Sequence, residues 1–267
     1  MKTILIGERL NSSNKKIRSL FDSGSIDEIV RIAGKQVEAG ASIVDINCSM
    51  MMGREREILF ETARAVIDML NVEVSIDSPD QGVLIEGAER FGIDCILNSI
   101  TCSPTDLERV GAAASASGAG LIVMTKDGNG IPSTPEGRLE LAGRAVELLG
   151  KAGIADERIF LDPVFSPVAT DVAGLETALG TLRGLTSEFP GCRRVGGLSN
   201  ISFGLPDRRL LNRSFLPVAM EAGLDTVICD VTDAGLMDTL HAAEAITGRD
   251  RGCRSFLRHY RSKKGPE

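Results

Sequence analysis

The chain contains few of the residues from which metal sites and nucleophilic catalytic centres are usually built. Its 267 residues include no tryptophan, one tyrosine and two histidines, His241 and His259. Catalytic triads and most zinc sites use histidine, so histidine-based chemistry is effectively excluded. Six cysteines are scattered without a Cys-x-x-Cys pair. We expect them to be the reduced thiols of a cytoplasmic protein rather than a disulfide framework.

Long apolar runs and an excess of positive charge are also missing. No run approaches the roughly 20 residues that cross a bilayer, and Gly7 and Glu8 interrupt the first apolar stretch. We therefore expect neither a membrane segment nor a signal peptide. The net charge of −7 argues against a nucleic-acid partner. Residues 249–267 are the exception, because they hold seven of the 30 basic residues and two of the 37 acidic ones.

What the sequence does contain is a regular alternation of short apolar runs and amphipathic segments. The runs lie near residues 3–6, 43–46, 73–76, 95–97, 121–124, 159–161, 194–196 and 226–229. Their length and composition are typical of buried parallel strands, and the segments between them have the helical period. Eight evenly spaced units without a linker predict an α/β fold, a single (β/α)8 TIM barrel over residues 1–248. We expect the basic segment 249–267 to pack on this barrel or at a subunit interface.

Serine, threonine, proline and glycine mark the expected helix ends. Helix starts are expected at the capping box Ser25–Glu28, at Ser78–Gln81 with Pro79 as the first helical residue, at Ser103-Pro104 and at Thr134-Pro135. Left-handed helix ends are expected at Gly40, Gly153 and Gly223. Because a helix tolerates proline in its first turn, Pro217 places a helix start near Ser214 and leaves residues 201–213 as a long connection.

Nearly every expected strand is followed by a side chain that forms hydrogen bonds. These side chains are Glu8, Asp45, Asn47, Asp77, Asn98, Lys126, Asp162, Ser199, Asn200 and Asp230. In a TIM barrel the carboxyl ends of the strands form the active site. Capping of the next helix explains any one of these residues about equally well. Asp77 and Asp162 are different, because each lies directly before a natural cap or a proline and is expected to face the barrel mouth.

A ring of carboxylates and carboxamides suits a flat heterocycle with N–H donors on one edge. The ring N–H and exocyclic amine of a 2-amino-4-oxopyrimidine form a fork that one carboxylate can accept, and a purine stays possible on chemistry alone. Zinc bound by Cys48, Cys102 and Cys229, which all follow expected strands, is a less favoured alternative, because isolated buried cysteines are commoner than ligands.

Seven segments at the strand ends carry a resemblance to a known family. They are residues 6–11 (IGERLN), 45–47 (DIN), 75–78 (SIDS), 97–99 (LNS), 161–163 (LDP), 197–202 (GLSNIS) and 212–215 (NRSF). In this order they resemble the methyltetrahydrofolate:corrinoid protein methyltransferases. That family has a pterin-binding TIM barrel related to dihydropteroate synthase and to the folate module of cobalamin-dependent methionine synthase. The resemblance extends to about residue 260.

The resemblance implies roles for individual residues. Asp77, Asn98 and Asp162 match the family's pterin-ring ligands, and Gly197 and Ser199 line the same site. Asn200 matches the asparagine that hydrogen-bonds N5 of the folate as the methyl group leaves. The remaining candidates in motifs of this site are Glu8, Asn11 and Asp45. No metal bound by the chain itself is implied.

Dihydropteroate synthase activity is not expected. That enzyme carries a Ser-Arg-Lys motif after strand seven and an Arg-x-His motif near strand eight. Here the corresponding segments, residues 199–202 and 229–232, read SNIS and CDVT. The cations that would hold its pyrophosphate and anionic substrate are missing from these segments.

The acceptor or donor on the other side of the reaction is expected to be a corrinoid, with tetrahydrofolate or 5-methyltetrahydrofolate as the substrate. The sequence lacks the Asp-x-His-x-x-Gly signature of common cobalamin-binding domains, so a partner protein is expected to carry the corrinoid. Met50, Met51 and Met52 offer an adaptable apolar patch for that partner, and an internal or homodimer contact explains them equally well. By analogy with the family the chain is a homodimer.

Two other functions remain open, and the direction of methyl transfer does not follow from the sequence. The chain could be a non-catalytic folate-binding module of a larger methyl-transfer complex. It could also be a thiol methyltransferase with a cysteine-bound zinc.

Overall fold

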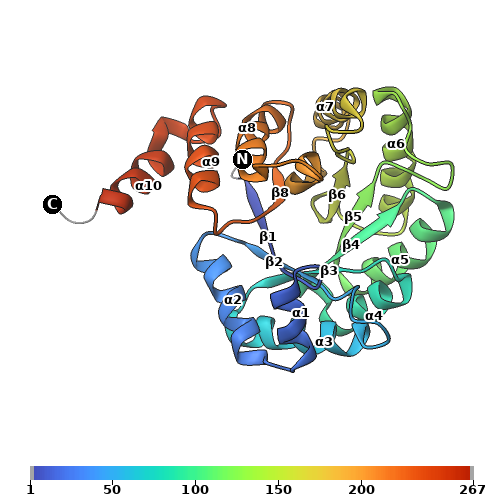
Figure 1. Ribbon diagram of the computed structural model, residues 1–267. Coiled ribbons are helices and arrows are strands. Elements are labelled where there is room, and N and C mark those ends of the chain that lie inside the picture. The colour runs from blue at the N-terminus through green and yellow to red at the C-terminus, as the bar shows by residue number, and fades with distance from the viewer. Residues whose placement is uncertain (1–2, 265–267) are drawn as a thin grey trace.

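Eight parallel strands close into a barrel in the computed structural model, which describes residues 3–264 (Figure 1). Each strand pairs with the next one in the chain, and β8 pairs with β1. The strands are β1 (Ile4–Asn11), β2 (Ile43–Asn47), β3 (Glu73–Asp77), β4 (Cys95–Thr101), β5 (Gly120–Met124), β6 (Ile159–Asp162), β7 (Arg193–Gly197) and β8 (Thr226–Cys229). The predicted TIM barrel and its eight strands are confirmed.

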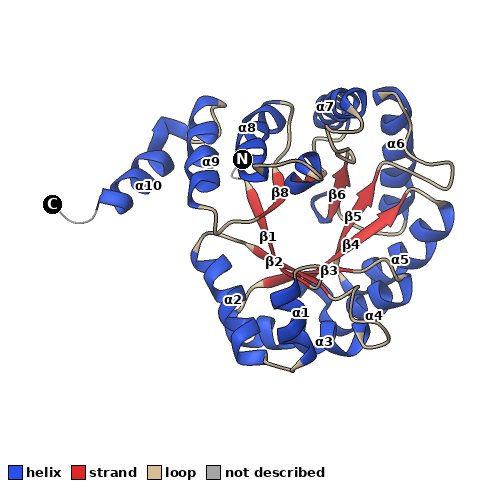
Figure 2. Cartoon of the chain, in the orientation of Figure 1, coloured by secondary structure: helices blue, strands red, loops and turns tan. Residues whose placement is uncertain are grey.

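Helices surround the strands on the outside (Figure 2). The α-helices are α1 (Lys15–Asp22), α2 (Ile26–Glu38), α3 (Glu55–Leu70), α4 (Gln81–Phe91), α5 (Pro104–Ser117), α6 (Pro135–Lys151), α7 (Val172–Glu188), α8 (Arg208–Glu221), α9 (Ala234–Ile246) and α10 (Arg254–Lys264). Short 3-10 helices are η1 (Gly92–Asp94), η2 (Asp156–Arg158), η3 (Leu198–Ser202) and η4 (Arg251–Cys253). Within residues 3–264 no helix is long and apolar enough to span a membrane.

The barrel interior is filled by one apolar side chain from most strands. This cluster consists of Ile6, Ile43, Ile96, Ile122, Phe160 and Val195, with Ile4 and Ile228 packed against it. Larger apolar clusters fill the space between the strands and the helices. Side chains alternate along a strand, so the residue two positions after each interior side chain also faces inward, one layer closer to the mouth.

Of the four helix starts predicted from a cap residue, those at Ser25, Ser103 and Thr134 are confirmed and the one at Ser78 is wrong. Ser103 and Thr134 cap α5 and α6, each followed by proline. Ser25 precedes α2 but makes no capping hydrogen bond, because its Oγ contacts Ser23 Oγ. The start at Ser78 is wrong by two residues, because Asp80 caps α4 by accepting a hydrogen bond from the Gly82 N–H.

The two residues expected to complete those capping boxes are engaged elsewhere. Glu28 accepts from Arg31 Nε at 2.8 Å. Gln81 donates its side-chain amide to Asp106, and Ser78 Oγ donates to Glu55 Oε1 at 2.7 Å. At the other helix ends, Gly40, Gly153 and Gly223 have the positive φ that was expected.

The connection expected over residues 201–213 is largely helical, which corrects the prediction drawn from Pro217. The helix α8 begins at Arg208, so Pro217 lies in its interior rather than in its first turn. On either side of Pro217 the helix buries Phe215, Leu216 and Ala219 against the apolar core. This packing outweighs the backbone hydrogen bond that the proline removes.

The helix α10 lies beyond α9, away from the strands (Figure 1). Its His259 ring packs on His241 of α9 with ring centroids 4.2 Å apart. His259 Nε2 lies 2.7 Å from Asp238 Oδ1, also on α9. Both histidines are therefore used in the contact between these two helices.

Candidate functional site

A polar layer closes the barrel interior at the carboxyl ends of the strands. Its side chains stand two positions after an inward-facing side chain, as Glu8 follows Ile6 and Asp162 follows Phe160. We define the polar layer as Glu8, Asp45, Asn47, Asp77, Asn98, Asp162 and Asp230. Asn47, Asp77 and Asn98 are consecutive partners in the registers of β2, β3 and β4. The structure thus brings together at one end of the barrel side chains that are far apart in the sequence.

Asp45 is the deepest carboxyl group of this layer and holds Asn98. Asp45 Oδ1 accepts hydrogen bonds from Ser75 Oγ at 2.6 Å and from Asn98 Nδ2 at 3.1 Å. Burial raises the pKa of Asp45 well above its usual range, and the carboxylate of Asp77 raises it further. Asp45 therefore fixes the orientation of the Asn98 amide rather than presenting an open charge to the mouth.

Asp77 lies at the end of β3 and is oriented by Asn47, a strand-end residue to which the family resemblance assigned no role. Asn47 Nδ2 donates to Asp77 Oδ2 at 2.9 Å, and Asn47 Oδ1 accepts from Ser49 Oγ at 2.8 Å. Burial raises the pKa of Asp77 to about 6, against the lowering effect of the hydrogen bond from Asn47. The sequence signal for Asn47 is its place at the end of an expected strand, and the strand register then brings it beside Asp77.

Asp162 is held by an unusual backbone conformation in the loop after β6. Its Oδ1 accepts from the Val164 N–H at 2.7 Å, and Val164 has φ +61°. The buried guanidinium of Arg138 supports this loop by donating to the carbonyl oxygens of Pro163 at 2.6 Å and Val164 at 3.3 Å. Burial raises the pKa of Asp162 to about 6, against the effects of the Val164 N–H, Lys126 and Arg138.

Sequence reasoning missed Arg138 entirely. The residue lies in the first turn of α6 at a position that gave no periodic or motif signal. Its partners, Pro132, Pro163 and Val164, belong to two different loops. Only the folded barrel brings these loops to the same side chain.

Glu8 contacts the segment that follows β7. Ser199 Oγ donates to Glu8 Oε2 at 3.1 Å, although the two residues are 191 positions apart. Burial raises the pKa of Glu8 to about 7; the bond from Ser199 lowers it, and the nearby Asp230 raises it. This carboxyl group therefore keeps its proton to a higher pH than an ordinary glutamate does.

Asn200 is exposed on η3, directly after the strand end. A Cβ at Gly197 would lie 3.0 Å from Asn200 Nδ2, so the glycine leaves room for the amide. Arg208 holds η3 by donating from Nη2 to Ser199 O at 2.8 Å and from Nε to Ser202 Oγ at 3.1 Å. A cation therefore does lie beside residues 199–202, although it comes from another position in the sequence.

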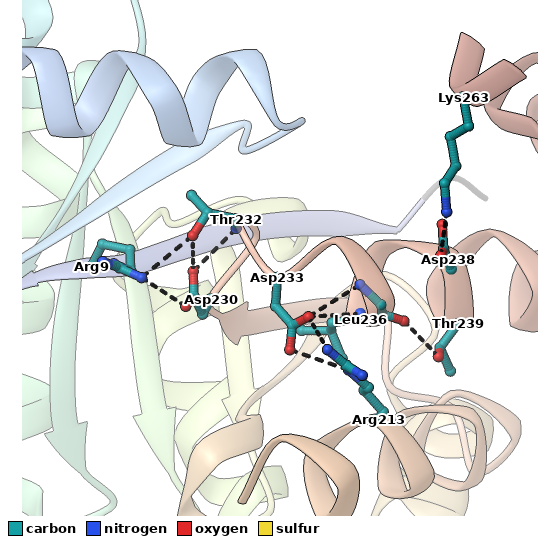
Figure 3. A network of polar contacts seen from close by, with 10 residues as sticks. Arg9, Arg213, Asp230, Thr232, Asp233, Leu236, Asp238, Thr239 and Lys263 are labelled. Carbon is teal, nitrogen blue, oxygen red and sulfur yellow. Dashed lines mark hydrogen bonds and ion pairs between the residues drawn. The ribbon is translucent and has the colours of Figure 1, made fainter. Parts of the chain in front are cut away.

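Beside residues 229–232 the cation is Arg9, which pairs with Asp230 at 3.0 Å and contacts Thr232 (Figure 3). Asn11, a further candidate, uses its Oδ1 to accept from the Ser13 N–H at 2.9 Å, in the turn that follows β1.

The cysteines near the strand ends lie in apolar surroundings. Burial raises the pKa of Cys102 to about 12 and raises those of Cys48 and Cys229 strongly. Cys102 Sγ contacts the carbonyl oxygen of Met124 at 3.3 Å. Over residues 3–264 no three His, Cys, Asp or Glu side chains are arranged as they would be around a metal ion.

Large apolar side chains are exposed after the carboxyl ends of the strands, on loops and on the first turns of α7 and α8. We call Met50, Met52, Ile131, Val172, Phe203 and Leu210 the apolar rim. Met52 is 93% exposed and Phe203 67%. The expected patch of three methionines is wrong in one member, because Met51 is 4% exposed and belongs to the core.

Comparison with known proteins identifies relatives of the whole chain. The pterin binding enzyme family matches residues 7–230. A methylcorrinoid:tetrahydrofolate methyltransferase of Eubacterium limosum is 30% identical over 270 residues, which cover 98% of each chain. A methionine synthase of Mycobacterium tuberculosis is 29% identical over 240 residues, or 84% of this chain and 20% of that protein.

Two solved structures have the same fold. A DHPS of Yersinia pestis with a pterine–sulfa conjugate has a TM-score of 0.71 at 18% identity, covering 93% of this chain and 94% of that one. A dihydropteroate synthase of Coxiella burnetii in complex with pteroic acid has a TM-score of 0.66 at 17% identity, again covering 93% and 94%.

Proposed function

The chain belongs to the pterin binding enzyme family, and we propose that it is a methyltransferase. It moves a methyl group between N5 of tetrahydrofolate and the cobalt of a corrinoid that a partner protein carries. The observation that carries this proposal is the polar layer, in which buried carboxyl and amide groups converge at the barrel mouth. The name of the Eubacterium limosum relative supports the reaction class.

The pterin ring is held by Asp77, Asn98 and Asp162. An ionised carboxylate accepts two hydrogen bonds from the ring N–H and the exocyclic amine, while an amide can both donate and accept on a mixed edge. The hydrogen bond from Asn98 to Asp45 supports this role because it fixes the amide. Other residues beside the ring in this proposal are Gly197, Ser199, Glu8 and Asn11.

Asn200 donates a hydrogen bond to N5. Breaking the bond between N5 and the methyl carbon leaves an electron pair on nitrogen, and a donor aimed at N5 stabilises that charge as it develops. The amide is exposed on η3, which Arg208 holds through the Ser199 carbonyl oxygen, and it can reach a ring that lies over the polar layer. Asn200 is no acid, so it orients and stabilises but does not supply the proton.

Glu8 is the proton source in this proposal. Its pKa of about 7 means that it holds a proton at neutral pH in a large fraction of molecules. Its hydrogen bond with Ser199 places it beside the residue that precedes Asn200. Glu8→Gln is expected to abolish the pH dependence of methyl transfer near pH 7 while tetrahydrofolate still binds.

The apolar rim is the docking surface for the corrinoid protein. A reduced corrinoid supplies a cobalt(I) nucleophile for the methyl group. Exposed side chains such as Met52 and Phe203 surround the mouth, and flexible methionine adapts well to a partner's surface. A protein seated on this rim would cover N5 and exclude water from the transfer.

The docking surface can be tested separately from the chemistry. Met52→Ser combined with Phe203→Ser is expected to raise KM for the corrinoid protein and to leave the rate with free methylcobalamin unchanged. Met69→Ser is the matched control, because Met69 is 61% exposed near the end of α3 at the opposite face. If both variants behave alike, the apolar rim is not the docking surface.

The reaction itself is tested by anaerobic spectroscopy of methylcobalamin mixed with tetrahydrofolate and the protein. Asn200→Ala is expected to lower the rate by about 10²–10³ while tetrahydrofolate still binds. Asn129→Ala, an exposed loop asparagine, is the control and should keep the full rate. Binding of tetrahydrofolate by the wild type without methyl transfer would instead identify a non-catalytic folate module.

The basic segment 249–267 lies outside the chemistry of this proposal. Its described part, residues 249–264, is an extension that packs on the barrel domain, residues 1–248, and the contact between His259 and His241 supports this assignment; residues 265–267 lie outside the described residues. The homodimer expected from the family is checked by measuring the molar mass with static light scattering at several protein concentrations. A mass near twice 28.4 kDa is the expected result.

A further inference from the structure

We propose that a cationic cavity beside the barrel mouth binds the γ-linked glutamate tail of folate polyglutamates. The cavity lies between α1, α2 and the loop after β8, and it has a volume of about 210 Å³. The inference rests on the proposed function, since it names the form of folate that the same site takes.

The walls of the cavity concentrate positive charge in a chain whose net charge is −7. Among the residues that the structure describes, its lining carries four cations, Arg9, Lys16, Arg31 and Lys35, and one carboxylate, Glu28. Each added glutamate brings one more carboxylate to a folate tail. A cluster of cations without enough acidic partners is the complement of such a polyanion.

The two lysines are the cations that remain available to a ligand. Arg31 donates to Glu28 at 2.8 Å, and Arg9 pairs with Asp230 at 3.0 Å. Within residues 3–264 no ion pair engages Lys16 or Lys35. Both lysines line the cavity, where their charges add to the effect of Arg31, the main cause, in holding the pKa of Glu28 below its usual value.

The position of the cavity matches the side on which the tail must leave. In the proposed pose, Asp77, Asn98 and Asp162 hold the amino end of the pterin and Asn200, after β7, holds N5, so C6 beside N5 is expected on the side of the next strands around the barrel, β8 and β1. The tail is attached at C6. Consecutive residues of β1 connect the two sites, since Glu8 faces the polar layer and Arg9 lines the cavity and reaches Asp230 and Thr232 (Figure 3).

A longer tail therefore gains contacts that a single glutamate does not make. Each γ-linked glutamate extends the chain by at least the ~3.5 Å of an extended α-linked residue. The first glutamate follows the p-aminobenzoyl group out of the mouth, and the next ones reach Lys16 and Lys35. The gain is electrostatic at an exposed surface, so it weakens as salt is added.

The test is calorimetric binding of tetrahydrofolate monoglutamate and triglutamate to the full chain. The wild type is expected to bind the triglutamate about 5- to 20-fold more tightly at low salt, as two or three exposed ion pairs would give. In the double variant Lys16→Gln, Lys35→Gln this advantage should fall below about twofold, with the monoglutamate Kd unchanged. Lys15→Gln, an exposed lysine outside the cavity lining, is the control and should keep the advantage.

Equal affinities of the wild type for the two folates would overturn the inference, and so would an advantage that survives in the double variant. Loss of the advantage in Lys15→Gln as well would show a diffuse field rather than a site. A protein that binds the triglutamate more tightly through Lys16 and Lys35 but transfers no methyl group would refute the proposed function and leave the tail site standing.

Discussion

Replacing Arg138 by methionine tests whether the loop after β6 positions Asp162. Arg138 is 2% exposed, and its guanidinium donates to Pro132 O at 2.9 Å, Pro163 O at 2.6 Å and Val164 O at 3.3 Å. Val164 has φ +61°, which costs a β-branched residue about 1–2 kcal/mol. The carbonyl contacts of Arg138 hold this conformation, and the Val164 N–H in turn holds Asp162.

The cost to stability follows from the carbonyl groups that lose their donor. A buried acceptor left without a partner costs about 1–3 kcal/mol, and the three losses are not additive, so Arg138→Met should cost about 3–5 kcal/mol. At about 2–4 °C per kcal/mol for a chain of this size, the melting temperature should fall by about 6–20 °C. This is less than the total stability of most domains, so the variant is expected to fold.

The effect on the site has a definite sign. Burial raises the pKa of Asp162 from 3.8 to about 6, and the positive charge of Arg138 opposes that rise. In the wild type, Asp77 and Asp162 therefore become protonated as the pH falls through about 6, and tetrahydrofolate should bind more weakly below this pH. Without Arg138 the pKa of Asp162 rises further, so the pH at which binding weakens should move upward.

The assay is the affinity for tetrahydrofolate, measured calorimetrically from pH 5 to pH 8 below the melting temperature of each variant. Arg158→Met is the matched control, because Arg158 also donates to a carbonyl oxygen, that of Cys95 at 3.1 Å, and pairs with Glu73 at 2.8 Å. These contacts lie at the amino ends of the strands, so the control should lose stability without moving the pH profile. The reasoning is refuted if Arg138→Met and Arg158→Met give the same profile.

Three further substitutions probe the scaffold. Gly196→Ala would place a Cβ 2.3 Å from the ring of Phe165, so we expect a loss of about 1–3 kcal/mol in urea unfolding and weaker folate binding; full stability would contradict the close packing. Pro217→Ala restores a backbone N–H inside α8 and should raise the melting temperature, whereas a lower one would show that the helix needs the proline. Arg194→Met removes the cation that pairs with the buried carboxylate of Asp225, and the free energy of unfolding should fall by about 3–5 kcal/mol. The double variant Arg194→Met, Asp225→Asn should recover much of this loss, because it also removes the buried charge.

The barrel and the location of its polar layer follow from local patterns. Apolar runs mark buried strands, and the alternation of side chains along a strand brings Glu8 and Asp162 to the interior wherever Ile6 and Phe160 face inward. Cap–proline pairs such as Ser103-Pro104 also act over a few residues, and they are confirmed. Assignment of the pterin ligands and of Asn200 stays a prediction that the binding and rate measurements test.

Local patterns failed where tertiary contacts outweighed them. Pro217 is a strong local signal for a helix start, but burial of its neighbours Leu216 and Ala219 keeps the helix continuous through the proline. Ser78 is a good helix cap by sequence, but its hydroxyl group donates a hydrogen bond to Glu55 of the neighbouring helix α3. In each case the competing contact comes from outside the window that a sequence pattern covers.

Strand periodicity already specifies which residues stand at the barrel mouth, because it depends only on neighbours in the chain. The contacts between those residues, by contrast, depend on the folded barrel. Asp45 holds Asn98 across 53 positions, Ser199 donates to Glu8 across 191, and Arg138 joins two loops to support Asp162. Such partners are set by the register of adjacent strands and by the closure of the barrel, and these long-range distances leave no periodic trace in the chain.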